Sequence, residues 1–364
     1  MRVDPFSLPL AAPLATAAGT LDRREGFVVR CDRNGVAGIG EATPLPGWTE
    51  SVGDCERALV GASEASDGGD AGPAPVGDRA AAAGQSLDGD PALSGLDANE
   101  VPAARHGVAT SLFDAEARDE GVPLYRWFDD DRRRDRVPVN ATVGDADPAK
   151  TVERGRAAVA EGFDCLKLKV GVRPLDADLE RVRAVREAVG DGVALRLDAN
   201  GAWDRETGAR ALERLATLDV AYVEQPLPAD DLDGLAALRG GPVGVAVDES
   251  LVHARVGDVL DAGAADVLIL KPMVLGGPGR AYAAATRARE AGVEPVVTTT
   301  VDGAVARAAA VHVAAALPDV APCGLATADR LGTDIAPDPA PVDGGEVAVP
   351  QDPGVGVEPG EVTT

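Results

Sequence analysis

Residues 165–171 read CLKLKVG, a stretch in which apolar residues alternate with two lysines. An alternation with a period of two predicts a β-strand that has Leu166 and Leu168 on one face and Lys167 and Lys169 on the other. Lysine is costly to bury without a partner. The lysine face of this strand must therefore meet acidic groups or solvent.

Similar apolar runs recur along the chain on both sides of this strand. From residue 137 onward, short Val/Leu/Ile runs alternate with Ala/Arg/Glu-rich segments of helical pattern. The runs end near Val143, Lys169, Asp198, Glu224, Asp248, Lys271, Thr298 and Gly324. Successive ends lie 23 to 29 residues apart, the length of one strand and one helix. Eight such units predict an α/β fold with a (β/α)₈ TIM barrel. An open doubly wound sheet is the alternative, but no G-x-G-x-x-G motif follows the first run.

The rest of the chain has a different pattern. Residues 1 to about 60 are typical of strands and turns, with a hairpin turn at 33–35, and residues 101–121 predict a helix. Residues 62–100 are acidic, with almost no large apolar side chain, and predict a low-complexity insertion whose middle is loosely ordered and solvated. We therefore expect an N-terminal domain at 1–135, a barrel domain at 136–330, and a C-terminal segment at 331–364 that returns to the N-terminal domain.

The composition is strongly acidic and poor in aromatic residues. Sixty Asp and Glu residues against 35 Lys and Arg residues give a formal net charge of −25, and aromatic residues make up 3%. Such a surface repels nucleic acid and anionic membranes, and it predicts a halophilic protein whose self-repulsion is screened by salt. The four cysteines form no CxxC pair, and no apolar run is long enough to span a membrane. We expect a cytoplasmic protein without disulfides or zinc.

Charged residues occupy five consecutive predicted strand ends. They are Lys169, Asp198, Glu224, Asp248 and Lys271. Catalytic groups of a barrel gather at the C-terminal ends of its strands, so we expect these side chains in one mouth. The three carboxylates form an all-oxygen ligand set, which selects Mg²⁺ or Mn²⁺ over zinc. The sequence therefore predicts a divalent metal site that leaves positions for a substrate carboxylate.

The predicted strand geometry sends Lys167 and Lys169 into the same mouth, opposite Lys271. A second ammonium, a metal and partial desolvation are each expected to lower the pKa of Lys169 toward that of a base. Such a base can remove a proton next to a metal-bound carboxylate. A Schiff-base aldolase, with a strand-end lysine as nucleophile, is an alternative that has no need of three acids.

With these residues placed, the chain resembles the muconate-lactonizing subgroup of the enolase superfamily over nearly its whole length. The matching segments are GIGEATPLPGWTES (38–51), LKLKVG (166–171), RLDANGAWDRETGARAL (196–212), YVEQPL (222–227), VAVDESL (245–251), LILKPMVLGGPGRA (268–281) and TTTVDGAVARAAAVHVAAALPD (298–319). The resemblance implies a modified barrel covered by an α+β capping domain that both chain ends form. It also implies that Asp198, Glu224 and Asp248 bind Mg²⁺.

Within the subgroup the chain is most similar to the o-succinylbenzoate synthases. The segments that carry this likeness are PLPGWTES (44–51) and APCGLATADRLGTDIA (321–336). Dipeptide epimerases usually carry an Asp-x-Asp pair in the second segment, and this chain has none between residues 323 and 331. The family's seventh strand commonly reads Ser-Ser-x-x-Glu-Ser, where this chain has Thr-Thr-Thr-Val-Asp-Gly at 298–303.

This second resemblance implies a carbon–oxygen lyase of menaquinone biosynthesis. The reaction would be Mg²⁺-dependent dehydration of 2-succinyl-6-hydroxy-2,4-cyclohexadiene-1-carboxylate to o-succinylbenzoate through an enediolate. Lys169 would move the proton, Lys271 would stay charged over the ring, and Lys167 would tune Lys169. The implied substrate contacts are Thr298, Gly324, Trp48, Thr49 and Ser51, the last three in a loop that closes over the substrate. An N-acylamino acid racemase or dipeptide epimerase uses the same lysines and is the alternative.

Overall fold

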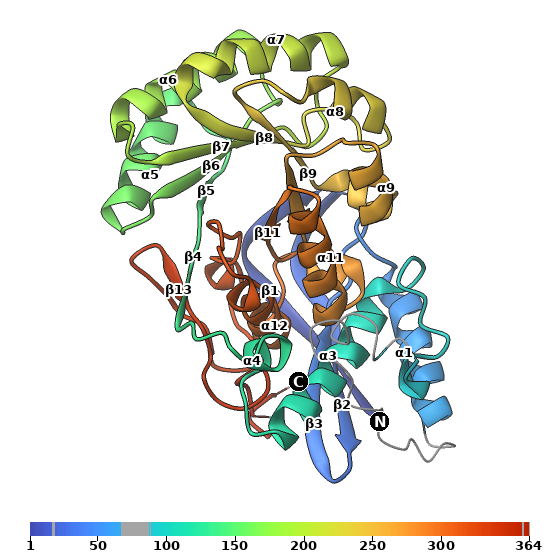
Figure 1. The fold of residues 1–364 in the computed structure, drawn as a ribbon. Coiled ribbons are helices and arrows are strands. Elements are labelled where there is room, and N and C mark those ends of the chain that lie inside the picture. The colour runs from blue at the N-terminus through green and yellow to red at the C-terminus, as the bar shows by residue number, and fades with distance from the viewer. Residues whose placement is uncertain (17–18, 67–86, 88, 359, 364) are drawn as a thin grey trace.

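The computed structural model describes residues 1–16, 19–66, 87, 89–358 and 360–363. Its largest sheet has seven strands in the order β11-β10-β9-β8-β7-β6-β5, and every neighbouring pair is parallel (Figure 1). These strands are β5 (Ala141–Val143), β6 (Cys165–Lys169), β7 (Ala194–Asp198), β8 (Val220–Glu224), β9 (Gly244–Val247), β10 (Val267–Leu270) and β11 (Glu294–Val297). Each ends within one residue of its predicted end, so the α/β prediction and the strand rhythm are confirmed.

Helices follow the strands in the alternating order expected from the sequence. They are α5 (Pro148–Ala160), α6 (Leu175–Val189), α7 (Arg205–Leu215), α8 (Leu232–Leu238), α9 (Val256–Asp261), α10 (Pro272–Leu275), α11 (Pro278–Glu290) and α12 (Ala304–Ala316). Short 3₁₀ helices are η2 (Ala216–Leu218), η3 (Glu249–Val252) and η4 (Ala328–Arg330). Figure 1 shows α5 to α8 on the outer side of β5 to β8.

The eighth strand position is filled by only two residues. Cys323 forms a parallel bridge with Val139, next to β5, and Gly324 forms one with Thr298, next to β11. The curled sheet is thereby closed into a barrel-like ring. The predicted full strand is wrong here, because Pro322 has no N–H and interrupts pairing on its side.

Side chains alternate across the sheet as the sequence predicts. Leu166 and Leu168 are fully buried in the core cluster that the surrounding helices share. A second cluster lines the inner face of the barrel and consists of Tyr222, Ala246, Val267, Ile269 and Val296. Lys167 and Lys169 of β6 lie on the same side of the sheet as this inner cluster, because the register pairs Lys167 with Arg196 and Arg196 with Tyr222.

The N-terminal part forms a three-stranded antiparallel sheet of β1 (Arg2–Thr16), β2 (Gly19–Arg33) and β3 (Val36–Ala42). Asn34 and Gly35 have φ angles of 56° and 83°, so the predicted hairpin turn is confirmed. The helices of this part are α1 (Val52–Ser66), η1 (Pro91–Leu93), α3 (Pro102–Asp119) and α4 (Leu124–Phe128). Helix α1 occupies residues that we expected to form strands and turns.

The predicted insertion at 62–100 is ordered at both of its described ends. Ala62 lies in α1 and is buried, and Leu87, Leu93 and Leu96 belong to the same core cluster. Both described ends of the insertion therefore pack against the core. The middle of the insertion, at 67–86 and 88, lies outside the described residues.

The C-terminal segment lies against the N-terminal part. Strand β13 (Glu346–Ala348) pairs with β4 (Arg136–Pro138) and with β12 (Val342–Asp343). Leu331 bridges to Leu10 of β1, and Arg30 of β2 donates to the carbonyl of Val362. Within the described residues, no helix is both long and apolar enough to cross a membrane.

Candidate active site

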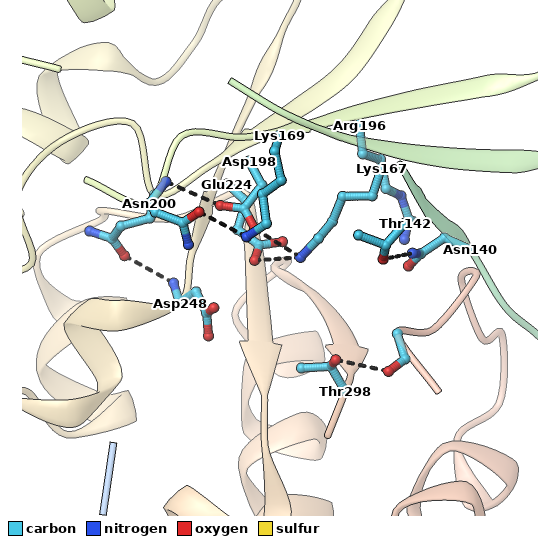
Figure 2. Close-up of polar contacts among 12 residues, drawn as sticks. Asn140, Thr142, Lys167, Lys169, Arg196, Asp198, Asn200, Glu224, Asp248 and Thr298 are labelled. Atoms are coloured by element: carbon cyan, nitrogen blue, oxygen red, sulfur yellow. Dashed lines mark hydrogen bonds and ion pairs between the residues drawn. The ribbon is translucent and has the colours of Figure 1, made fainter. Parts of the chain in front are cut away.

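Two lysines and two carboxylates meet at the ends of β6, β7 and β8 (Figure 2). Lys167 Nζ lies 2.8 Å from Glu224 Oε1 and 3.1 Å from Asp198 Oδ2. Lys169 Nζ lies 2.7 Å from Asp198 Oδ2 and 2.8 Å from Asn200 Oδ1. The strand register places Lys169 beside Asp198 and Asp198 beside Glu224. The lysine face of β6 therefore meets acids.

Burial and close pairing set the protonation of this cluster. Burial alone would raise the pKa of Asp198, but Lys167 and Lys169 outweigh it and hold that pKa well below its usual range. Burial and the charge of Asp198 raise the pKa of Glu224 to about 8. Burial by itself would lower the pKa of Lys167, but Asp198 and Glu224 raise it well above its usual value. Lys167 is thus the counter-ion of two carboxylates.

The third lysine has a more enclosed environment. Lys271 Nζ lies 2.5 and 2.6 Å from the two carboxylate oxygens of Asp248. The same Nζ lies 3.4 Å from the centroid of the Trp48 ring, a cation–π contact. The Lys271 side chain is 9% exposed, whereas that of Lys169 is 33% exposed. Lys169 is therefore accessible, and Lys271 is covered by an aromatic ring and paired with an acid.

The three carboxylates have the chemistry of a magnesium site. Asp198, Glu224 and Asp248 are all buried and offer oxygen ligands from three adjacent strand ends. Oxygens of Asp198 and Glu224 already surround one cationic centre, Lys167 Nζ. Among the described residues, however, no three His, Cys, Asp or Glu side chains converge as a metal cluster. The carboxylates pair with lysines instead, and Asp248 pairs with Lys271. The donor set, three buried carboxylates, fits a divalent cation.

Comparison with known proteins identifies the family of this chain. The family described as Enolase C-terminal domain-like matches residues 150–362. The chain belongs to the enolase superfamily. An o-succinylbenzoate synthase of Thermobifida fusca is 42% identical over 211 residues, which cover 57% of this chain and 64% of that protein. The matched region thus spans less than two thirds of that relative.

Epimerases of the superfamily match over a longer region. The L-Ala-D/L-Glu epimerase of Bacillus subtilis is 29% identical over 363 residues, which cover 97% of this chain and 94% of that protein. A substrate-liganded structure of that enzyme has a TM-score of 0.83 with 28% identity and covers 98% of this chain and 97% of its own. A dipeptide epimerase of Enterococcus faecalis, solved with Mg and the dipeptide L-Leu-L-Tyr, has a TM-score of 0.81. At 24% identity, with 98% of each chain covered, that structure shows the shared fold.

Three residues near the carboxylates were missed in the sequence. Gln225 is buried and links two strand ends, because its Oε1 accepts from the backbone N–H of Asp248 and of Ser250. Asn200 joins Lys169 to Glu249, whose Oε1 accepts from Asn200 Nδ2 at 2.8 Å. Asn200 and Gln225 both have positive φ angles, of 45° and 39°. Asn200 comes two residues after Asp198, in DAN, and Gln225 comes directly after Glu224, in EQP. This closeness to the acidic strand ends was the available signal.

The residues expected to contact substrate lie at the barrel closure, against Lys271, and within the 44–51 loop. Thr298 and Gly324 face each other across the barrel closure, where Thr298 Oγ1 donates to the Gly324 carbonyl at 2.9 Å (Figure 2). The Trp48 ring contacts one of the three lysines, Lys271. Thr49 Oγ1 accepts from a backbone N–H of its own loop, and Ser51 Oγ accepts from the backbone N–H of Asp54 at the start of α1. Thr49 and Ser51 thus use these hydroxyls to shape the loop.

Proposed function

We propose that this protein catalyses the Mg²⁺-dependent dehydration of 2-succinyl-6-hydroxy-2,4-cyclohexadiene-1-carboxylate to o-succinylbenzoate, a step of menaquinone biosynthesis. The observation that carries the proposal is the unequal environment of Lys169 and Lys271. A dehydration that begins and ends on one face of the substrate needs one lysine that moves a proton and one that stays a cation. Two-base epimerisation needs proton transfer by both.

In this proposal each lysine has its own part in the reaction. Lys169 is accessible and would take the proton from the carbon next to the substrate carboxylate. The same lysine would return that proton to the departing hydroxyl, so that water leaves and the ring becomes aromatic. Lys271, held between Asp248 and Trp48, would stabilise the negative charge that develops on the substrate. Lys167 would keep Asp198 and Glu224 in place.

Asp198, Glu224 and Asp248 would hold Mg²⁺. The bound ion would supply positive charge next to the substrate carboxylate and so make the neighbouring proton more acidic. Support comes from the all-oxygen donor set and from the Mg present in the dipeptide epimerase structure. Gln225 would fix the spacing of Glu224 and Asp248 through its bond to the Asp248 backbone.

We also propose that the N-terminal domain, residues 1–135, and the C-terminal segment, residues 331–364, form one capping domain over the barrel. Contacts of Leu331 and Val362 with the β1–β2 hairpin support this division of the chain. Trp48 belongs to this domain, and its ring contacts Lys271. It would close the Lys271 side of the site over a bound carboxylate substrate.

The direct test is turnover of the cyclohexadiene carboxylate, followed by ultraviolet absorbance in high-salt buffer with Mg²⁺. Lys169→Ala should abolish turnover while leaving the circular dichroism spectrum unchanged, and a chelator should abolish it in the wild type. The matched control is Lys150→Ala, because Lys150 is exposed on α5. Full activity of Lys169→Ala would refute the assigned role.

The long match to the L-Ala-D/L-Glu epimerase favours a second candidate, epimerisation of a dipeptide or of an N-acylamino acid. Its signature is exchange of the substrate α-proton with solvent deuterium, with both Lys169 and Lys271 required. Exchange without any turnover of the cyclohexadiene carboxylate would replace the lyase with this reaction.

A further inference from the structure

The segment 298–303 connects β11 to α12 and begins with the proposed substrate contact Thr298. Val301, in its middle, has a φ angle of +63°. A β-branched residue is strongly disfavoured in this left-handed region. Such a conformation persists only where the surrounding structure imposes it. Contacts from outside this segment must therefore hold Val301.

Arg24 of β2 supplies one of these contacts from the N-terminal sheet. Its side chain is 1% exposed, and its Nε donates to the carbonyl of Val301 at 3.2 Å. The other two nitrogens donate to the carbonyls of Thr43 and Pro44 at 2.8 and 3.0 Å. Arg24 is therefore fixed by two bonds to the residues that follow β3, and its third bond holds the strained residue.

Glu41 of β3 supplies a second contact just beyond it. Its Oε1 accepts from the Gly303 N–H at 2.7 Å, and its Oε2 accepts from the Ala306 N–H at 3.0 Å. Gly303 is the N-cap residue of α12 and has no side chain to cap the helix, so a carboxylate from another sheet does so. A Cβ on Gly303 would lie 2.9 Å from Glu41 Oε2. The space that a capping side chain would use is filled by Glu41.

The segment is also tied to the barrel closure. Thr298 Oγ1 donates to the Gly324 carbonyl, and Thr299 Oγ1 lies 3.0 Å from Thr327 Oγ1. Residues 298–303 are therefore held on one side by the closure and on the other by the N-terminal sheet.

We propose that Arg24 and Glu41 are positioning residues, which set the place of Thr298 in the candidate site by imposing the conformation of 298–303. This inference rests on the proposed role of Thr298 in substrate binding. Neither residue touches substrate in this proposal. Each acts through the backbone of the segment, and together they make substrate affinity depend on the N-terminal sheet.

A double-mutant cycle between Arg24 and Val301 tests the first contact. Glycine adopts positive φ without a penalty, so Val301→Gly removes the need for Arg24. Arg24→Met should raise KM about tenfold in the wild-type background and less than about threefold in the Val301→Gly background, because a small displacement of a binding group has an effect of this size. Mg²⁺ affinity should stay unchanged. The matched control is Arg23→Met, because Arg23 is the exposed neighbour on the same strand.

A purely structural role for Arg24 would give a different result. Arg24→Met would then lower the melting temperature but leave KM unchanged at temperatures where the protein is folded. An equal rise in KM in both backgrounds would also overturn the proposal, because it would show that Arg24 acts independently of the strain at Val301.

Hydrogen exchange tests the Glu41 contact without reference to the reaction. At pH 8.5, where Glu41 is a carboxylate with two acceptor oxygens, the amides of Gly303 and Ala306 should exchange at least about tenfold faster in Glu41→Gln, since a Gln side chain has one acceptor for two donors. The control Glu25→Gln changes an exposed acid on β2 and should leave both amides protected. Unchanged protection in Glu41→Gln would refute the contact. Failure of the proposed function would appear instead as a wild type inactive on the cyclohexadiene carboxylate, and the KM cycle would then be run with the epimerase substrate.

Discussion

Glu41 should make the stability of this protein fall as the pH rises. It is fully buried, and burial, with the charges of Asp302 and Asp334, raises its pKa from an ordinary 4.5 to about 7. Between these values the folded state binds a proton that the unfolded state has lost. The stabilising proton is fully present below pH 4.5 and is lost as the pH rises through 7.

The size of this effect follows from the two pKa values. At about 1.4 kcal/mol per pH unit, the whole change from 4.5 to about 7 corresponds to about 3 kcal/mol. The isoelectric point near 4.4 makes measurements below pH 5 impractical, because an uncharged protein precipitates. Between pH 5.5 and 8.5 the wild type should lose about 2 kcal/mol of unfolding free energy through Glu41 alone.

Glu41→Gln isolates this contribution, because glutamine does not titrate. Guanidinium unfolding of the variant and the wild type should be compared at pH 5.5 and 8.5 at constant ionic strength. The difference in unfolding free energy should shift by about 2 kcal/mol in favour of the variant at the higher pH. Glu25→Gln, which changes an exposed acid, should run parallel to the wild type. Parallel curves for Glu41→Gln would instead show that the Glu41 carboxyl titrates normally and makes no such contribution.

Three further changes have expected outcomes. Burial lowers the pKa of His312 to about 4, so the neutral imidazole stabilises the fold above pH 6.5 and this stability is lost on acidification. In the same unfolding assay, the wild type should lose about 1 kcal/mol of unfolding free energy through His312 between pH 7.5 and 5.5, and His312→Asn should not show this loss. An unchanged pH dependence of the unfolding free energy in His312→Asn would contradict this. Lys167→Met should lower the unfolding free energy of the metal-free protein by about 3 kcal/mol or more, because two buried carboxylates lose their shared partner, with Lys150→Met as the exposed control. Gln225→Leu should weaken Mg²⁺ binding about tenfold or more by calorimetry while the protein stays folded, and equal affinity would exclude a role in spacing the ligands.

The strand pattern was predictable because each barrel strand carries its own local signal. A short apolar run followed by a charged residue marks the end of β6, β7 and β8 to the residue. The two errors lie where that signal fails. Helix α1 contains Gly53 and Gly61, which weaken its helical pattern. The eighth position is interrupted by Pro322, so the barrel closes through isolated bridges that the alternation of residues does not reveal.

The candidate site was predictable to the extent that it follows from the parallel register. Adjacent strand ends in a barrel must be neighbours, so Lys169, Asp198 and Glu224 could be placed together from spacing alone. The contacts of Gln225 and Trp48 depend on how loops fold after the strands end. Those of Arg24 with Val301 join residues 277 positions apart, and no local pattern encodes such a contact.

The choice of lysine at this site is itself informative. Only four of the 35 basic residues are lysines, and three of them are Lys167, Lys169 and Lys271. Elsewhere buried positive charge is carried by arginine, as in Arg24, Arg181 and Arg307, each at most 1% exposed. Arginine matches carboxylates with a fixed fork and does not release its proton in proteins, whereas lysine is a compact charge whose proton can be transferred. A site that needed only permanent counter-ions for three acids could use arginine as the rest of the chain does. Lysine at these positions therefore supports a site in which a side chain exchanges a proton with the substrate.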